Sequence, residues 1–198
     1  MRAAFPPEGA ETAADLAAGA AERAGGDDSD RRSAAVLCAL FDDSGEAAVV
    51  LTRRSSTLRS HTGEVSFPGG RLEAGESPLQ AALRETEEEV GIDPASVEVI
   101  GSLRPVGTAT SGSSIVPFVA ALDSVPLLRP NPAEVDRAFT VTLSELVAPG
   151  VYHDELWGRD GAVHLVQFFE LHGEGETVWG VTARMLCDLL DRVLRPTG

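Results

Sequence analysis

The residues Ser77–Gly91 combine the end signals of a single helix with a cluster of acidic side chains. Ser77 is suited to cap the helix, with Gln80 three residues on as its capping-box partner, and Pro78 suits the first turn. Gly91 suits the left-handed residue that ends a helix. The sequence therefore predicts a helix over Pro78–Val90. One buried stripe at helical spacing is expected to consist of Leu79, Leu83, Thr86 and Val90.

Glutamates occupy a second face of this predicted helix. Glu85, Glu88 and Glu89 fall at i, i+3 and i+4, so their carboxylates are neighbours. Like charges at that spacing cost roughly 0.2–0.5 kcal/mol per pair, and the helix dipole disfavours anions near the C-terminus. A solvated acidic face is one interpretation. A bound cation is the other, and clustered carboxylate oxygens suit Mg²⁺ or Mn²⁺.

Apolar segments of strand length lie on both sides of this helix in the sequence. The expected strands are Ala34–Phe41, Ala47–Thr52, Val65–Phe67, Val97–Val106, Ile115–Leu122, Glu134–Val141 and Val163–Leu171. The third is expected to stop at Pro68, Gly69 and Gly70. A short helix is expected from Ser144 to Leu146, and a longer one over about Val181–Leu194. This pattern predicts an α/β fold in which helices enclose a mixed β-sheet.

Composition narrows the organisation of the chain and its partners. The first 30 residues are mostly Ala, Gly, Asp and Glu, which predicts an N-terminal arm, in part disordered, before one domain over residues 31–198. The net charge of −15 argues against nucleic acid and against an anionic membrane surface. The apolar runs are too short to span a membrane. Two distant cysteines form no disulfide framework or zinc spacing, which indicates the cytoplasm.

The segment Gly69–Ile92 resembles the Nudix box, whose pattern is G, five residues, E, seven residues, R-E-aliphatic-x-E-E-x-G-aliphatic. The matching residues are Gly70, Glu76, Arg84, Glu85, Glu88, Glu89, Gly91 and Ile92. Thr86 departs from the pattern, because an aliphatic residue is usual at its position. It faces the buried stripe, so we expect a change in packing rather than lost chemistry.

The resemblance implies an α/β/α sandwich and a metal-dependent diphosphatase. It implies metal binding by Glu85, Glu88 and Glu89, with the Gly69 carbonyl as a weaker candidate. Arg84 is the expected orienting residue, and Glu76 is expected to tie the loop to the helix through Arg84 or a metal-bound water. Which glutamate acts as the general base stays open. Glu134 could add a carboxylate near the metals, although a surface role is an equal alternative.

The stretch Leu51–Gly70 resembles the signature of the coenzyme A pyrophosphatase subgroup, L-T-x-R-S, three residues, R, three residues, G-x-V-x-F-P-G-G. The matching residues are Leu51, Thr52, Arg54, Ser55, Arg59, Gly63, Val65, Phe67, Pro68, Gly69 and Gly70. An acidic chain needs local cations to hold phosphates, and arginine forks suit phosphate oxygens. The expected substrate-binding residues are Arg53, Arg54, Arg59 and His61, joined by Ser111 from a Ser-Gly loop that also resembles the subgroup.

These observations predict hydrolysis of CoA or acyl-CoA to 4′-phosphopantetheine and 3′,5′-ADP. One alternative is a Nudix diphosphatase for ADP-ribose, NADH or a nucleoside triphosphate. Another is a non-catalytic module that senses a nucleotide, although the box has lost none of its carboxylates. The expected partner is a small-molecule substrate, and a homodimer is a reasonable default.

Overall fold

The computed structural model describes residues 34–56, 63–107, 114–159 and 161–194; the expected N-terminal arm lies outside these ranges. No helix within them is long and apolar enough to cross a membrane. The strands are β1 (Ala34–Asp43), β2 (Glu46–Arg54), β3 (Val65–Ser66), β4 (Gly69–Arg71), β5 (Val97–Ser102), β6 (Val106–Gly107), β7 (Ser114–Leu122), β8 (Val135–Thr142), β9 (Tyr152–Arg159), β10 (Ala162–Leu171) and β11 (Glu176–Trp179). The helices are α2 (Pro78–Val90), the 3-10 turn η2 (Pro94–Ser96), α3 (Leu143–Leu146) and α4 (Gly180–Leu194).

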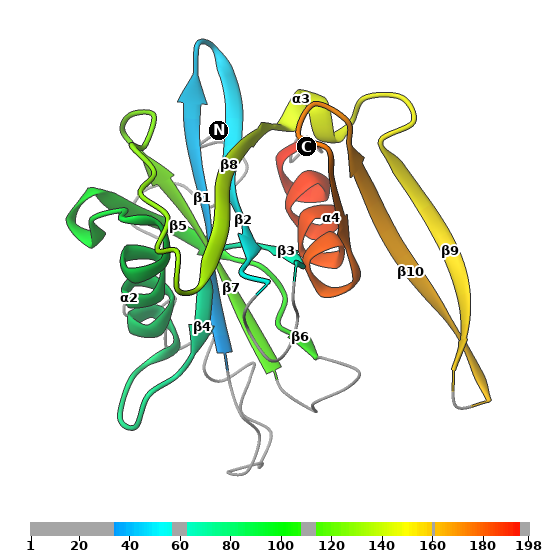
Figure 1. Cartoon of the computed structure of the whole chain (residues 1–198), viewed down its shortest axis with the longest axis horizontal. Helices are drawn as coiled ribbons and strands as arrows, with labels where there is room; N and C mark the ends of the chain where they lie inside the picture. The colour runs from blue at the N-terminus through cyan, green and yellow to red at the C-terminus, as the bar shows by residue number, and fades with distance from the viewer. Residues whose placement is uncertain (1–33, 57–62, 108–113, 160, 195–198) are drawn as a thin grey trace.

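A mixed β-sheet lies between α2 and α4 (Figure 1). Its main path runs β3-β2-β1-β7-β5, with β4 beside β1, β6 beside β7 and β8 beside β2. Strands β1 and β7 are parallel, whereas the other pairs in this sheet are antiparallel. Alternate residues of β1 enter two separate cores, so Ala35 and Leu37 pack on the α2 side while Val36 and Cys38 pack on the α4 side. The predicted α/β fold is confirmed.

Helix α2 begins and ends at the predicted residues, Pro78 and Val90. Ser77 and Gln80 form the reciprocal capping box, and Gly91 adopts the left-handed conformation, with φ of 74°. Strong local signals at both ends explain why this element is readable from sequence alone.

Three strand predictions need correction. Strand pairing begins again immediately after Pro68, because Gly69–Arg71 forms β4, which pairs with β1. A Cβ atom at Gly69 would lie 2.3 Å from the Ala35 carbonyl oxygen, so only glycine permits this close approach. The strand expected over Val97–Val106 is two strands, β5 and β6.

The third difference is a separate sheet of three antiparallel strands in the order β11-β10-β9. Only β10 was expected among these strands. Its second half is buried, with Phe169 and Leu171 in the core, but its first half is exposed. Strand β9 lacks the alternation of apolar and polar residues that predicts a half-buried strand.

Candidate active site and metal centre

Three glutamates from two distant segments meet beside the C-terminal half of α2. Glu85 and Glu89 come from the helix, and Glu134 comes from the loop that precedes β8. One carboxylate oxygen from each residue lies within 4.8 Å of the other two. The helical spacing that aligned Glu85 with Glu89 was readable in the sequence, whereas the approach of Glu134 depends on the path of the loop.

Backbone hydrogen bonds hold that loop against the end of the helix. The Asn131 amide donates to the Glu89 carbonyl over 2.9 Å, and the Arg129 amide donates to the Val90 carbonyl over 2.8 Å. The Ser55 amide, at the end of β2, donates to the Glu134 carbonyl over 2.8 Å. Carbonyls in the last turn of a helix have no partner within the helix, so the loop satisfies them while it delivers Glu134.

Glu89 is the most deeply buried member of the trio. Its residue surface is 2% exposed, and the Gly69 amide donates to its Oε2 over 3.0 Å. Arg54 approaches its other oxygen at 3.7 Å. Burial raises the pKa of the Glu89 carboxyl to about 7, although the Gly69 amide and the Arg54 guanidinium favour the ionised form. Burial and the neighbouring Glu88 and Glu134 carboxylates likewise raise the pKa of Glu85, against the opposing effect of Arg84.

Arg84 joins the loop before α2 to the carboxylates on the helix. Its Nε and Nη2 donate to the two oxygens of Glu76 over 2.9 and 3.1 Å, and its Nη1 lies 3.1 Å from Glu85 Oε1. The bond from Arg84 lowers the pKa of the Glu76 carboxyl. Such a two-point contact fixes both direction and distance, so Arg84 is positioned to orient Glu85.

Glu88 stands apart from the trio. Its side chain is 52% exposed, and its Oε2 accepts a hydrogen bond from Arg84 over 3.0 Å. Metal binding by Glu88 stays a prediction. The third carboxylate is that of Glu134. For this residue the sequence left a metal-site role and a surface role as equal alternatives.

Gly69 and Gly70 bring the backbone close to these carboxylates. A Cβ atom on Gly70 would lie 2.4 Å from Cδ of Glu85, so a side chain at this position would displace the carboxylate. Gly69 contacts the site through its amide. The contact of its carbonyl with a metal stays a prediction.

The arginines of the segment before the box point in different directions. Arg54 lies on the α2 side of the sheet, near Glu89. Arg53 follows the alternation of β2 to the other side, where its Nη1 donates to Glu176 over 2.9 Å. Arg59, His61 and Ser111 lie outside the residues that the structure describes.

The trio offers a compact set of hard oxygen ligands. Three carboxylates at this separation repel one another, and one of them is almost wholly removed from water. Oxygen ligands in that number and charge are typical of divalent cations such as Mg²⁺ and Mn²⁺. The site therefore fits a divalent metal held by Glu85, Glu89 and Glu134.

Comparisons with known proteins identify the family of this chain. A family profile described as the NUDIX domain matches residues 31–161. A relative in Photorhabdus laumondii, named as an uncharacterized Nudix hydrolase NudL, is 41% identical over 145 residues, which cover 73% of this chain and 76% of the relative. The protein of the same name in Escherichia coli K12 is 39% identical over 143 residues, or 71% of this chain and 72% of the relative.

Solved structures show the same fold at low sequence identity. A MutT/nudix family protein from Enterococcus faecalis matches with a TM-score of 0.58 and 17% identity, covering 94% of this chain and 71% of that one. The Nudix hydrolase RenU of M. smegmatis matches with a TM-score of 0.50 and 23% identity, covering 59% and 73%. These structures share the fold, and the profile and the two relatives show that this chain belongs to the Nudix hydrolase family.

Proposed function

We propose that this protein is a metal-dependent diphosphatase that cleaves CoA or acyl-CoA to 4′-phosphopantetheine and 3′,5′-ADP. The observation that carries the proposal is the carboxylate trio of Glu85, Glu89 and Glu134, with Arg54 of the CoA-type signature 3.7 Å from Glu89. The proposal includes a cytoplasmic location, expected from the two unpaired cysteines, Cys38 and Cys187.

The proposed metal ligands are Glu85, Glu89 and Glu134, with Glu88 and the Gly69 carbonyl as further candidates. A divalent cation bound there would neutralise diphosphate oxygens and lower the pKa of a coordinated water. Hydrolysis forms one bond between water oxygen and phosphorus and breaks the bond from phosphorus to the bridging oxygen. A carboxylate of the site takes the proton from the attacking water, and the cleaved bridge oxygen leaves on the second phosphate.

The residues around the trio hold these groups in place. Arg84 holds Glu85 through its Nη1, and Glu76 anchors Arg84 from the loop before the helix. Arg54 has its guanidinium at the edge of the site, where a phosphate oxygen of the substrate can replace its long contact with Glu89. Arg53 is bonded to Glu176 on the other side of the sheet. We therefore propose that Arg54, rather than Arg53, binds the diphosphate.

CoA carries a 3′-phosphate in addition to its diphosphate, and an acidic chain needs a separate cation to hold it. Arg59 and His61 are the proposed residues, because they follow Arg54 closely in the sequence and Arg59 matches the signature. Ser111 is proposed to contact the substrate from its loop. The roles of Arg59 and Ser111 come from the sequence resemblance, and that of His61 comes from its place in the same cationic stretch.

The first test is hydrolysis of CoA, dephospho-CoA, ADP-ribose, NADH and ATP by the purified protein with Mg²⁺ or Mn²⁺, with products identified by mass. We expect 4′-phosphopantetheine and 3′,5′-ADP from CoA, at a higher kcat/KM than for the other compounds. A preference for ADP-ribose, NADH or ATP would reject CoA as the substrate and retain the metal site.

Variants then separate the metal site from the specificity residues. Glu89→Gln should lower turnover of every substrate by at least about a hundredfold, within the range attributed to positioned catalytic groups. Glu87→Gln is the matched control, because Glu87 lies on the same helix with an exposed side chain. Arg59→Ala should raise KM for CoA more than for dephospho-CoA, and equal increases would assign Arg59 to the diphosphate.

A further inference from the structure

Exposed apolar side chains are concentrated on one part of the molecule. Among the described residues, ten large apolar side chains are exposed by 40% or more, and eight of them lie on the β9–β10–β11 sheet or beside α4. These eight are Val147, Tyr152, Leu156, Trp157, Val163, Leu165, Trp179 and Leu194. Scattered exposed residues are ordinary on a soluble protein, but a cluster of this kind marks an interaction surface.

Four of these eight side chains lie on one face of the β9–β10 hairpin. Leu156 stands opposite Leu165 in the antiparallel register, and Tyr152 stands opposite Phe169, which is buried in the core beside α4. Residues two apart on a strand share a face, so Tyr152, Leu156, Val163 and Leu165 all lie on the face that turns toward α4, where Asp154 stands between the first two. We call these four residues the hairpin patch. Leu156 and Val163 are 72% and 70% exposed.

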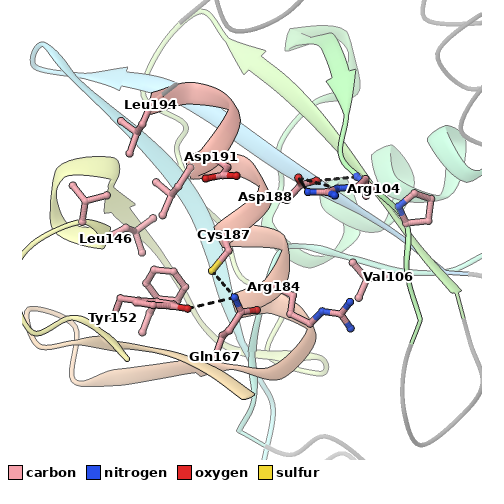
Figure 2. Close-up of a pocket in the computed structure, with 14 residues that line it drawn as sticks. Arg104, Val106, Leu146, Tyr152, Gln167, Arg184, Cys187, Asp188, Asp191 and Leu194 are labelled. Atoms are coloured by element: carbon pink, nitrogen blue, oxygen red, sulfur yellow. Dashed lines mark hydrogen bonds and ion pairs between the residues drawn. The ribbon is translucent and has the colours of Figure 1, made fainter. Parts of the chain in front are cut away.

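A groove that shares Tyr152 with the hairpin patch lies beside α4 (Figure 2). It has a volume of about 840 Å³, and it is lined by Tyr152 and Gln167 from the hairpin and by Leu190 and Leu194 from the helix. Within the groove, Arg104 and Asp188 are bonded to each other at 2.9 Å. Much of the groove wall is therefore apolar, and the charges of Arg104 and Asp188 in it neutralise each other.

The far end of the hairpin projects away from the large sheet and from both long helices (Figure 1). A two-stranded hairpin by itself is only marginally stable in water, and it becomes stable when a further layer covers one face. Strand β9 is also an edge of its sheet, since it pairs with β10 alone among the described strands. Both features indicate that another protein surface packs against this hairpin.

We propose that the partner is a second copy of this chain, with the two hairpin patches packed on each other across a two-fold axis. Each copy carries a net charge of −15, so two copies repel wherever their acidic surfaces approach. The stretch 162–169 contains no Asp, Glu, Lys or Arg. On this face of β9 the described residues include one charged side chain, Asp154, whose carboxylate accepts a hydrogen bond from the Tyr152 hydroxyl. A mainly apolar surface with a single charge is where two such acidic chains can meet with the least repulsion.

The available area suits an interface of this kind. The hairpin patch with Val147 and Leu194 exposes roughly 250–450 Å² of apolar surface, taking an aliphatic side chain at roughly 60–120 Å² and tyrosine at roughly 150–250 Å² when fully exposed. A standard interface buries about 800 Å² per partner, of which about 56–65% is apolar. The surface therefore supplies about half or more of the apolar area that one side of a stable dimer requires. A two-fold axis lets the same surface serve both copies.

Sedimentation velocity over a range of micromolar concentrations tests this proposal on the 198-residue chain. We expect a dimer that dissociates on dilution. Leu156→Asp and Leu165→Asp should each raise the dissociation constant by at least about tenfold, because a charge would be buried in an apolar contact. Leu127→Asp is the matched control, since Leu127 is 73% exposed and lies in the loop before β8. It should leave the dissociation constant within about twofold of the wild type, as substitutions outside an interface do.

Salt provides a readout that needs no variant. Raising ionic strength from about 0.01 M to about 1 M shortens the Debye length from about 30 Å to about 3 Å, which screens repulsion between the two acidic copies. The wild-type dimer should therefore tighten with salt. A wild type that is monomeric at every concentration, a dimer that loosens with salt, or equal dissociation by Leu127→Asp would each overturn the proposal. Metal-dependent turnover per chain, measured on the same samples, reports whether each variant is folded.

Discussion

Replacing Glu89 with glutamine should stabilise the metal-free protein at alkaline pH. Glu89 is buried, and its carboxyl has a pKa of about 7 against an ordinary value of 4.5. Above pH 7 the folded chain must hold a buried carboxylate beside Glu85 and Glu134. Glutamine has nearly the same shape, and its carbonyl oxygen can still accept the hydrogen bond from the Gly69 amide. It carries no charge.

The size of the effect follows from the two pKa values. The difference between about 7 and 4.5, at 1.36 kcal/mol for each pKa unit, corresponds to about 3 kcal/mol. Because the folded-state pKa is the higher one, the folded chain binds the proton more tightly. The stabilisation is complete below the unfolded pKa of 4.5 and is lost as pH rises through about 7.

Urea unfolding with a chelator present, at pH 5 and pH 8, measures this difference. The wild type should lose up to about 3 kcal/mol relative to Glu89→Gln between the two pH values, which corresponds to a midpoint shift of about 1–2 M urea. Mn²⁺ at about a thousandfold excess over Kd should reverse the order at pH 8, because the wild type then gains about 4 kcal/mol of binding free energy, which exceeds the difference of about 3 kcal/mol, and the variant gains little.

The control is Glu87→Gln, which removes an exposed charge from the same helix and should follow the wild type at both pH values. If Glu89→Gln were no more stable than the wild type at pH 8 without metal, the carboxylate would not be a source of strain in the folded chain. An unchanged order of the two proteins after addition of Mn²⁺ would remove Glu89 from the set of metal ligands.

Three further substitutions test neighbouring parts of the site. Gly70→Ala should lower turnover at least tenfold in a folded protein, because the new methyl group must displace Glu85; a circular dichroism melt gives the folding control. Arg84→Lys should lower kcat more than it raises KM, since lysine cannot reproduce the two-point contact with Glu76, and unchanged kinetics would contradict the orienting role. Thr86→Val should change the free energy of unfolding by no more than about 1 kcal/mol and leave turnover unchanged, because the buried hydroxyl bonds only within its own helix.

The helix that carries the Nudix box was predictable because its determinants are local. Its capping residues lie within one turn of each end, and the spacing of Glu85 and Glu89 follows from 3.6 residues per turn. The same regularity identified Thr86 as a residue of the buried stripe, and its side chain is buried. Each of these statements depends on residues fewer than five positions apart.

The strands were predictable where both the pattern and the burial were regular. Strand β7, with its long run of buried residues, was expected at Ile115–Leu122 and begins one residue earlier. Strand β4 was not expected, because glycine is disfavoured in strands and its pairing depends on a close approach to β1. Strand β9 was not expected either, since it is held by its register with β10 rather than by burial of its own side chains.

The sequence by itself determined the family, the helix with its capped ends and the alignment of Glu85 with Glu89, because local backbone geometry and motif spacing encode them. Tertiary structure decided that Glu134 completes the carboxylate trio and that Glu88 stays exposed with Arg84. It also decided that β2 sends Arg53 away from the site. These outcomes depend on which segments pack together. A contact between residues 45 positions apart, such as Glu89 and Glu134, exists only after loops and strands have closed around the core.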